Sequence, residues 1–570
     1  MSVLSKIKQY NKDYGMKYTM RKVYYRYQIK YKLGKKYFPI EISKSVRKEQ
    51  EEWKTDNDYT ISIVVPLYNT PENFLRDMIE SVIWQTYGGW ELCLADASDA
   101  FHQNQIEAIV KEYQKSDERI KYRKLASNDG ISNNTNSAII MAQGQFIGLM
   151  DHDDILHPSA LYWVMQEITK YGADFVYTDE LSFVKDTEHV QSVHLKPDFK
   201  QESFRNNNYI CHFTVFEKDL LERTGRFRKK YDGSQDYDLF LRLTSEASVI
   251  RHIPKVLYYW RLHSGSSASG VAAKPYVVEA GRRALVEYLR HSTEGAIVES
   301  SKAHPSFYKV TYHVPESSRV YIIVQDEDTE QWVKKSIKDL KADIKISLVE
   351  RFEKNGDFEK ISLADIEIYD YIVFVRKGYK PENDGSEWLM ELLQCLQPVD
   401  NKAASVMVYN EDATIYHAGY CYNSQWNEKI RSLYKNMPRK EAGYMNKLEF
   451  RQNVSLLGGA VLAVKNEIYT NWIKDNYDKI NNRWNGFDIW SDQAWFSMCF
   501  TAQRNFGDCV LSPYAPFINE SDIHDDEFNQ LKLSEDEWKK FMAEWKEVMS
   551  EHDKCYNKEM DIFGKYYFLW

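Results

Sequence analysis

The stretch Gly148-Leu149-Met150-Asp151-His152-Asp153-Asp154 decides how this chain is interpreted. The apolar run from Phe146 to Met150 predicts a buried strand, which ends abruptly in a group of carboxylates. Carboxylates resist burial unless they are paired or bind a cation. An Asp-x-Asp sequence at the end of a parallel strand suits Mg²⁺ or Mn²⁺, for which substrate phosphates supply other ligands. The structural alternative is a polar loop that is simply acidic.

The residues before this stretch alternate between strand and helix patterns. Strands are expected at 60–65, 90–95, 121–125 and 144–150, and helices at 71–85, 106–113 and 128–142. Pro66 cannot donate a backbone hydrogen bond and is expected to end the first strand. The alternation predicts an α/β fold in which helices flank a mostly parallel sheet.

Each expected strand finishes in polar residues. The residues at these ends are Tyr68, Asp96, Asn128 and the pair Asp151/Asp153. In open α/β sheets, ligands bind at the carboxyl ends of the strands. The repeated coincidence favours a binding site over an incidental acidic loop.

Composition limits the class of protein. A chain of 570 residues predicts two to four domains, and 43% hydrophobic with 28% charged residues fits soluble globular protein. The cysteines form no CxxC pair, which is typical of a reduced compartment rather than a disulfide framework or zinc site. No apolar run reaches membrane-spanning length, and no signal-peptide pattern opens the chain. We therefore expect a cytoplasmic protein. No nucleic-acid partner is expected, although the mild net charge of −9 says little about this.

Residues 1–55 are strongly basic and rich in tyrosine. From Lys6 to Lys48 there are 14 Lys and Arg residues against Asp13 and Glu41, with tyrosines at helical spacing. Such a segment predicts an amphipathic helix on an anionic membrane surface. A helix docked on the catalytic domain, or an arm that binds another acidic partner, is the alternative.

Several motifs resemble those of family-2 glycosyltransferases with the GT-A fold. In chain order they are Val65-Pro66-Leu67-Tyr68-Asn69, Ala95-Asp96-Ala97-Ser98, Asn128-Asp129-Gly130-Ile131-Ser132, Asp151-His152-Asp153-Asp154, Lys196-Pro197-Asp198-Phe199, Asn208-Tyr209-Ile210, Ser234-Gln235-Asp236-Tyr237-Asp238-Leu239 and Tyr259-Trp260-Arg261-Leu262-His263. The resemblance extends over about residues 58–290 and is specific as an ordered set. It points to bacterial members that build cell-surface polysaccharides, rhamnosyltransferases among them.

The resemblance implies a role for each matched residue. The nucleotide sugar would be held by Pro66, Tyr68, Asn69, Asp96, Asn128, Gly130 and Asp151. The metal, Mn²⁺ or Mg²⁺, would bind Asp151, Asp153 and His263. Asp236 would be the general base that deprotonates the acceptor hydroxyl. Trp260 and Arg261 would face the acceptor.

Each of these residues has a structural alternative. Asp236 could be a surface charge at a helix start, His263 a satisfied loop histidine and Trp260 a packing residue. Two differences from the family pattern make the identity of the sugar donor less certain to predict. The base-binding segment has one acid, Asp96, where the family often has two, and Gln235 stands where an acid commonly precedes the base.

The second half of the chain repeats the alternation. Strands are expected at 319–324, 344–349 and 371–375, with helices at 332–340 and 388–396. The segment 371–375 looks like a second metal-binding strand, but Arg376-Lys377-Gly378 stands where Asp-x-Asp should be, and two cations cannot chelate Mg²⁺. Ser455–Ala460 and 485–488 resemble later family segments, but Ser491–Ala494 replaces the usual acidic base region. The repeat suggests an internal duplication, and we expect a degenerate GT-A-like module that would bind acceptor glycan or a partner, or support the first domain. A second active enzyme, with Asp488 or Asp492 as the base, is the alternative.

These observations predict four regions. They are a basic helical segment 1–55, a catalytic GT-A domain 56–295, a degenerate GT-A-like domain 315–530 and a helical tail 531–570. The expected function is inverting transfer of a sugar from a nucleotide donor, dTDP-rhamnose or a UDP-hexose, to a lipid-linked surface glycan at the inner face of the cell membrane. Small flexible residues at 264–273 suggest a lid or a linker.

Two other functions compete with this one. A non-catalytic scaffold or glycan-binding subunit of an assembly complex would explain the basic segment and the weakened second half. A nucleotidyltransferase would need a glycine-rich phosphate loop after the first strand, and Pro66-Leu67-Tyr68-Asn69 is not one. The sequence leaves the sugar, the linkage and the oligomeric state open.

Overall fold

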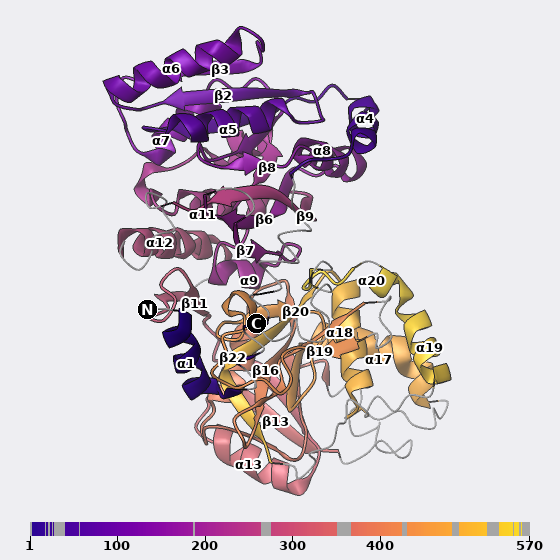
Figure 1. Ribbon diagram of the computed structural model, residues 1–570. Coiled ribbons are helices and arrows are strands. Elements are labelled where there is room, and N and C mark those ends of the chain that lie inside the picture. The colour runs from indigo at the N-terminus through magenta and orange to yellow at the C-terminus, as the bar shows by residue number, and fades with distance from the viewer. Residues whose placement is uncertain are drawn as a thin grey trace. The chain divides into compact units, whose positions relative to one another are not determined.

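The computed structural model of this chain contains two compact units, and each is described by itself. It describes residues 3–16, 19–20, 23–24, 27, 40–55, 57–185, 189–263, 275–293, 295–349, 366–423, 430–481, 489–520, 535–550, 552–557 and 560. The first unit comprises Met1–Phe199, Asn207–Tyr288 and Val298–Tyr308, and the second comprises Lys200–Asn206, Leu289–Ile297 and Lys309–Trp570. Figure 1 labels the elements of both units.

The N-terminal part of the chain alternates strands with helices as predicted. Its elements are α1 (Val3–Tyr14), α4 (Lys44–Glu52), β1 (Ile61–Leu67), α5 (Glu72–Ile83), β2 (Trp90–Asp96), α6 (Ala100–Gln114), β3 (Ile120–Lys124), α7 (Ile131–Ile139), β4 (Phe146–Leu149), β5 (Ile155–Leu156), α8 (Ala160–Tyr171), β6 (Phe175–Phe183), β7 (Val190–His194), α9 (Gln201–Asn206), β8 (Thr214–Glu217), α10 (Lys218–Thr224), η2 (Lys229–Tyr231), α11 (Gln235–Glu246), β9 (Ile250–Arg261), α12 (Pro275–Ser292), β10 (Ile297–Ser300) and β11 (Tyr308–Thr311).

The first unit is built on one mixed sheet. Its strand order is β3-β2-β1-β4-β8-β6-β9-β5, and β7 pairs with β6. The pairs among β1 to β4 are parallel, β6 and β9 are parallel, and β8, β7 and β5 join their neighbours antiparallel. The predicted α/β sheet flanked by helices is therefore confirmed, with antiparallel pairs entering after β4 (Figure 1).

Apolar burial on the central strands fixes this sheet. Every residue of β1 and β2 is buried, as expected for parallel strands covered on both faces. The core includes Leu75, Met78, Ile79 and Val82, which lie at helical spacing on α5. Asp99 caps helix α6, and its carboxylate accepts hydrogen bonds from two backbone N–H groups of the first turn.

The expectation that Pro66 ends the first strand is wrong, because β1 continues to Leu67. Pro66 pairs in register with Ala95 of β2, while the pairing of β1 with β4 stops at Val64 and Leu149. The missing N–H of the proline therefore falls where only one neighbouring strand continues. A central strand accepts proline at this position because no ladder hydrogen bond is lost there.

The second unit is also sheet-rich, as predicted. Its further elements are β12 (Arg319–Val324), α13 (Glu327–Ile337), β13 (Asp343–Leu348), β14 (Tyr371–Val375), β15 (Tyr379–Pro381), α16 (Glu387–Cys395), β16 (Asn401–Asn410), β17 (Ile415–His417), β18 (Tyr420–Tyr422), β19 (Ile430–Ser432), η4 (Tyr444–Asn446), β20 (Gln452–Val454), β21 (Val461–Lys465), α17 (Asn466–Asn481), α18 (Asp492–Arg504), β22 (Asp508–Asn519), α19 (Glu535–Glu544) and α20 (Lys546–Ser550).

The second sheet repeats the pairing scheme of the first. Its order is β13-β12-β14-β21-β16-β22-β15, and β17 pairs with β16. Three pairs are parallel: β13 with β12, β12 with β14, and β16 with β22. The other three are antiparallel: β14 with β21, β21 with β16, and β22 with β15. Read in the same order, β2-β1-β4-β8-β6-β9-β5 has the same sequence of parallel and antiparallel pairs. This agreement supports the predicted internal duplication.

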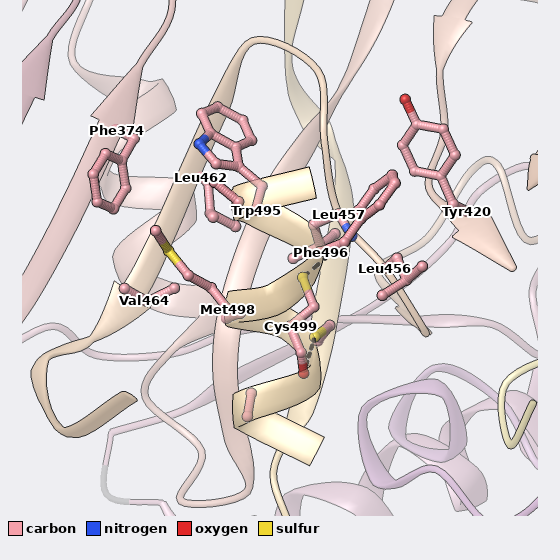
Figure 2. Packing of buried hydrophobic residues seen from close by; sticks show 14 of the residues in the cluster. Phe374, Tyr420, Leu456, Leu457, Leu462, Val464, Trp495, Phe496, Met498 and Cys499 are labelled. Carbon is pink, nitrogen blue, oxygen red and sulfur yellow. Dashed lines mark hydrogen bonds between the residues drawn. The ribbon is translucent and has the colours of Figure 1, made fainter. Parts of the chain in front are cut away.

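Two apolar layers cover the faces of the second sheet. Alternate residues of β12 belong to different core clusters, with Tyr321 and Ile323 on one face and Val320, Ile322 and Val324 on the other. On the first face, Trp495, Phe496, Met498 and Cys499 of α18 pack with residues of the neighbouring strands (Figure 2).

The two ends of the chain are described in part. The basic segment contributes α1 and α4, and the tail contributes α19 and α20. The predicted lid at 264–273 and the segment 485–488 lie outside the described residues, as do residues 566–570 of the expected helical tail. Within the described part of the chain, no helix is both long enough and apolar enough to cross a membrane.

Candidate active site

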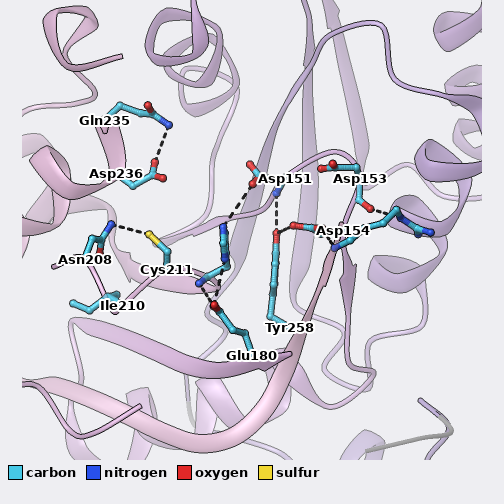
Figure 3. Close-up of polar contacts among 12 residues, drawn as sticks. Asp151, Asp153, Asp154, Glu180, Asn208, Ile210, Cys211, Gln235, Asp236 and Tyr258 are labelled. Carbon is cyan, nitrogen blue, oxygen red and sulfur yellow. Dashed lines mark hydrogen bonds and ion pairs between the residues drawn. The ribbon is translucent and has the colours of Figure 1, made fainter. Parts of the chain in front are cut away.

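The predicted site residues converge on the edge of the first sheet where β1, β2 and β4 end. The acidic loop 151–154 follows β4, Asp96 is the last residue of β2, and Tyr68 directly follows β1. Asp236 comes from the first turn of α11. Figure 3 shows Asp151, Asp153, Asp154, Asp236 and Tyr258 in this region.

Asp154 is the structural anchor of the acidic loop. It is fully buried, accepts a 2.5 Å hydrogen bond from the Tyr258 hydroxyl and accepts another, at 2.7 Å, from the backbone N–H of Arg261. Burial and the neighbouring carboxylates raise the pKa of Asp154 well above its ordinary value. The Tyr258 hydroxyl also accepts the backbone N–H of Asp151 at 3.2 Å. Strand β9 thereby fixes the loop that carries Asp151 and Asp153.

Asp153 and His263 form a close pair. The Asp153 Oδ2 and the His263 Nε2 lie 2.8 Å apart. The Asp153 carbonyl accepts a 2.6 Å hydrogen bond from the Nε of Arg261, which holds the backbone of the loop. The Phe74 ring lies 5.3 Å from the His263 ring and limits its position. Residues 110 positions apart are therefore brought together as the resemblance implies.

Asp151 presents a half-exposed carboxylate beside a histidine. Its Oδ2 lies 4.0 Å from the Nε2 of His212. Partial desolvation, together with repulsion from Asp153 and Asp236, raises the pKa of Asp151 to about 6, while His212 acts in the opposite direction. The His212 ring stacks parallel to Tyr258 at 5.3 Å and packs against Trp260 at 5.1 Å.

A buried ion pair supports His212 from below. Glu180 of β6 lies 3.0 Å from the Nζ of Lys196, whose side chain is fully buried, and 3.3 Å from the Nδ1 of His212. Lys196 also donates to the carbonyls of Ile210 and His212, at 2.8 and 2.7 Å. Burial disfavours the charged imidazole, but Glu180 outweighs burial and raises the pKa of His212 to about 9. The network therefore fixes a cation next to Asp151.

Asp236 lies at the N-terminal end of α11. Its Oδ1 accepts a 3.2 Å hydrogen bond from the side-chain amide of Gln235. Desolvation raises the pKa of Asp236, and the nearby charge of His212 partly offsets that rise. The neighbouring Asp238 has a different role, because its buried carboxylate pairs with Arg228 and Arg242. A single carboxylate of this helix start is thus left without an arginine partner among the described residues.

The residues expected to hold the nucleotide lie at the ends of β1 and β2. Asp96 is fully buried and accepts hydrogen bonds from the Ser98 N–H at 2.9 Å and from the Tyr122 hydroxyl at 2.6 Å. Ser98 in turn accepts the N–H of Asn69 at 2.7 Å. The Tyr68 ring is 50% exposed and is available to a ligand. Pro66 is buried within β1 and supports this turn from inside the sheet.

Asn128 and Gly130 shape the start of α7. The Asn128 side-chain oxygen accepts the N–H of Gly130 at 3.1 Å and the side-chain amide of Asn134 at 2.9 Å. Gly130 has a φ of +87°, and a Cβ there would lie 2.3 Å from the Asp232 Oδ2. Both residues have roles in backbone geometry, and their contact with a nucleotide stays a prediction.

Trp260 and Arg261 contribute differently from each other. Trp260 is partly buried and packs on His212. Arg261 is only 4% exposed, lies between the Phe74 and Phe183 rings, and donates to the Asp77 carboxylate at 2.8 Å as well as to Asp153. Its contacts hold the acidic loop from within, and its predicted role toward the acceptor stays a prediction.

The donor set suits a hard divalent cation whose shell a substrate completes. In the described part of the chain, no three His, Cys, Asp or Glu side chains converge as a complete metal-binding group. Mg²⁺ and similar ions are commonly held by one or two carboxylates together with substrate phosphates. The half-exposed Asp151 and the paired Asp153 and His263 offer such a partial set.

The sequence motifs did not identify His212, Glu180 and Lys196 as site residues. Lys196 belongs to the quoted segment Lys196-Pro197-Asp198-Phe199, and His212 follows Asn208-Tyr209-Ile210 closely. A glutamate within the apolar pattern of β6, Glu180, is the signal that could have pointed to a buried pair.

Comparison with known proteins assigns the family of this region. Residues 62–225 match the family model described as Glycosyl transferase family 2. The O-antigen biosynthesis protein RfbC of Myxococcus xanthus is 34% identical over 47% of this chain and 21% of that protein. The uncharacterized protein y4gI of Sinorhizobium fredii is 32% identical over 73% of this chain and 49% of that protein. The chondroitin synthase of Pasteurella multocida is 29% identical over 36% of this chain and 21% of that protein.

This chain spans about half the length of the Sinorhizobium protein and about a fifth of the other two. Among solved structures, TarS 1–349 of S. aureus in complex with UDP-GlcNAc is 20% identical with a TM-score of 0.35, over 40% of this chain and 66% of that one. At this TM-score the likeness adds nothing to the assignment, which depends on the sequence match. Residues 62–225 of this chain, with the acidic loop at the end of β4, are a glycosyltransferase family 2 domain.

Proposed function

We propose that this chain is an inverting, metal-dependent glycosyltransferase that transfers a sugar from a nucleotide donor to a lipid-linked cell-surface glycan. The observation that carries the proposal is the meeting of Asp151, the Asp153–His263 pair and Asp236 at one sheet edge. The family 2 domain supports the reaction class. The names of two relatives, an O-antigen biosynthesis protein and a chondroitin synthase, support a polysaccharide as the product.

In this proposal, the ends of β1 and β2 receive the nucleotide. The exposed Tyr68 ring would stack on the base, and the Asn69–Ser98–Asp96 hydrogen bonds would hold the turn beside it. Asn128 and Gly130 would border the same pocket from the start of α7. The base and the sugar of the donor are open, with dTDP-rhamnose and UDP-hexoses as the first candidates.

Asp236 would act as the general base. Its carboxylate would accept the proton of the acceptor hydroxyl as the acceptor oxygen bonds to the anomeric carbon of the sugar. The bond from that carbon to the phosphate oxygen breaks at the same time, and its electron pair leaves with the nucleoside diphosphate. A single displacement of this kind inverts the anomeric centre and needs no covalent intermediate.

Mn²⁺ or Mg²⁺ would bind Asp151, Asp153 and His263. When bound, the ion would supply positive charge for the leaving diphosphate. His212 would hold a second positive charge beside Asp151, because Glu180 and Lys196 fix its ring from below. Arg261 and Tyr258 would keep the acidic loop rigid during turnover.

The experiment that tests this function is donor turnover. The purified chain is incubated with a panel of nucleotide sugars, with and without Mn²⁺ or Mg²⁺, beside Asp153→Ala and Asp236→Asn. Slow metal-dependent release of nucleoside diphosphate from one donor, lost in Asp153→Ala, is the expected result. Silence across the panel without metal-dependent nucleotide binding would instead favour the non-catalytic scaffold.

We further propose that the basic segment 1–55 brings the enzyme to an anionic membrane surface at the inner face of the cell membrane. Its 14 Lys and Arg residues between Lys6 and Lys48 support this proposal. A variant without residues 1–50 should lose binding to vesicles that contain anionic lipid at moderate salt. Unchanged vesicle binding would refute the membrane role and leave the transferase proposal intact.

A further inference from the structure

The edge of the second sheet beyond β14 carries a polar cluster that the proposed function does not use. We call it the β14–α18 cluster, and its members are Arg376, Tyr379, Tyr416, His417, Tyr420 and Asp492. Arg376 directly follows β14 as the acidic loop follows β4, and Asp492 opens α18 as Gln235 and Asp236 open α11. The cluster therefore lies at the place in the second topology that the candidate active site has in the first.

Arg376 is held in place but leaves donors unused. Its Nη1 donates to the Asp492 Oδ1 at 2.6 Å and to the Gly459 carbonyl at 3.1 Å, and its guanidinium lies 3.7 Å from the Trp495 ring centre. Its Nε and Nη2 atoms are buried and have no hydrogen-bond partner among the residues the structure describes. Buried donors normally have an acceptor, so these two point to a group outside the described residues.

His417 adds a third unused donor. The side chain is 0% exposed, and its Nε2 accepts the N–H of Gly458 at 3.4 Å. Burial lowers the pKa of His417 to about 4, so the ring is neutral and carries its proton on Nδ1. That Nδ1 is buried and has no hydrogen-bond partner in the described part of the chain.

Tyrosine rings complete the cluster. The Tyr379 hydroxyl donates to the Tyr416 hydroxyl at 3.2 Å, and the two rings lie 5.9 Å apart. The Tyr420 hydroxyl donates to the Asp492 Oδ2 at 3.3 Å, and its ring packs 5.0 Å from His417. Figure 2 shows that Tyr420 and Trp495 belong to the packed core of this unit. The tyrosines thus combine ring surface with hydroxyl groups that both donate and accept.

The chemistry of the cluster favours a neutral ligand with many hydroxyl groups. Asp492 neutralises the charge of Arg376. A diphosphate would therefore find no net positive charge at this pair and would lie beside a carboxylate. A divalent cation would meet the guanidinium, which cannot act as a ligand. Sugar hydroxyls accept from unused N–H groups, donate to carboxylate and tyrosine oxygens, and leave ring faces to pack on aromatic side chains.

We propose that the β14–α18 cluster is a metal-independent carbohydrate-binding site, which takes the neutral saccharide chain that the first unit would extend. The identity of that chain rests on the proposed function, whereas the binding of a neutral sugar does not. A second site of this kind would keep a growing glycan attached between successive transfers, since two linked binding sites raise the effective concentration of the chain end.

The test is saturation-transfer NMR on the full-length protein in EDTA. The probes are the methyl glycosides of L-rhamnose, D-glucose, D-galactose and N-acetylglucosamine, with glucuronate and UDP as anionic probes. The variants are Arg376→Met, Tyr416→Phe, which removes one hydroxyl, and Asp153→Ala in the first unit. Lys377→Gln is the matched control, because Lys377 is exposed and adjacent to the cluster.

We expect saturation of at least one neutral sugar in EDTA, with affinity about tenfold lower in Arg376→Met, as for a lost hydrogen bond to a charged group. Tyr416→Phe should weaken binding less, and Lys377→Gln and Asp153→Ala should not change it. If Arg376→Met fails to fold by circular dichroism, Tyr416→Phe decides the question.

Three results would overturn the inference: no saturation of any neutral sugar, saturation of glucuronate or UDP alone, or neutral-sugar binding that is lost in Asp153→Ala but kept in Arg376→Met. Neutral-sugar binding, together with neither donor turnover nor metal-dependent nucleotide binding, would overturn the proposed function and leave this inference standing.

Discussion

The edges of the two sheets share one pairing scheme and carry opposite chemistry. After β4 the first sheet presents Asp151 and Asp153, whereas after β14 the second presents Arg376 and Lys377. Behind the first edge, Glu180 of β6 stands opposite His194, while the matching strand β16 places Val408 opposite His417. Among the described residues, the loop after β14 therefore lacks the carboxylates that follow β4, and an apolar residue stands where Glu180 stands in the first sheet.

This difference separates the residues that build the shared sheet from the residues that give each sheet edge its chemistry. The strand order of both sheets depends on apolar strands that pack between helices, and this pattern is present in both units. The charged groups at the edge are added to that frame, because loop side chains change without loss of core packing. Substitutions at matched positions of the two edges therefore separate catalysis from architecture.

The largest contrast is expected between Asp236→Asn and Asp492→Asn. Asp236→Asn should lower the turnover of the donor by about 100- to 10,000-fold, the usual contribution of a general base. Burial raises the pKa of Asp236, so the wild-type rate should rise with pH through a value above that of a free aspartate. Initial rates across pH measure both effects.

Asp492→Asn is the matched control, since Asp492 opens the corresponding helix of the second unit. Its transfer rate should stay within a few-fold of the wild type. A rate that survives Asp236→Asn but is lost in Asp492→Asn would reverse the assignment of the catalytic unit.

The next effect is expected for Asp153→Ala. Loss of the carboxylate that pairs with His263 should reduce turnover by about 100- to 1,000-fold, the scale for one electrostatic group at a reacting centre. The same variant should lose the metal dependence of nucleotide binding, which calorimetry with UDP or dTDP and Mn²⁺ measures. Metal-dependent binding that is equal to that of the wild type would contradict the metal role of Asp153.

The buried pair behind the first edge should matter for stability as well as for activity. Glu180→Gln leaves the Lys196 ammonium buried without its carboxylate and should lower the free energy of unfolding by about 3 to 5 kcal/mol. The partly exposed pair of Glu382 and Arg439 is the control, and Glu382→Gln should cost about 0 to 1 kcal/mol. Urea unfolding of the two variants measures both free energies.

The pH dependence has a definite sign. Burial alone would raise the pKa of Glu180, but Lys196 and His212 lower it well below its ordinary value. The stability that this group contributes is therefore present near neutral pH and is lost as the pH falls through the acidic range. Wild type and Glu180→Gln should converge in stability at low pH. A constant difference between them down to pH about 3 would argue against an ionised Glu180.

The smallest effect on transfer is expected for Arg376→Met. Arg376 takes no part in the reaction proposed for the first unit. The rate of transfer to a short acceptor should therefore change by less than about threefold, which is a change of less than about 1 kcal/mol in the activation free energy. A loss as large as that of Asp153→Ala would show that the second edge takes part in the reaction itself. Comparison of Arg376→Met and Lys377→Gln in the same assay separates the buried cation from the exposed one.

Much of the first sheet could be predicted from the sequence, because its strands and helices carry strong local patterns. The apolar residues of α5 repeat at helical spacing, and β1 and β2 are continuous apolar runs bounded by polar ends. The length of β1 was harder to predict. Whether Pro66 ends a strand depends on how far the neighbouring strand β4 extends, and that is a property of the sheet.

The roles of single site residues depend on contacts between distant segments. Asp154 and Asp153 are adjacent in sequence, but one is a buried anchor for Tyr258 and the other pairs with His263. The motif that contains Arg261 predicts that this residue faces the acceptor. Its guanidinium is instead buried under the acidic loop. Such differences depend on which distant residues each side chain contacts in the folded sheet.

The class of fold, the presence of a second sheet and the position of the acidic loop at a strand end could therefore be predicted from local patterns. These features follow from hydrophobic periodicity and from the cost of burying carboxylates, which act along the chain. The tertiary structure adds that His212 is held beside Asp151 by Glu180 and Lys196, and that Arg376 and His417 have buried donors without a partner among the described residues. Those facts depend on hydrogen bonds between residues far apart in sequence, for which no local pattern exists.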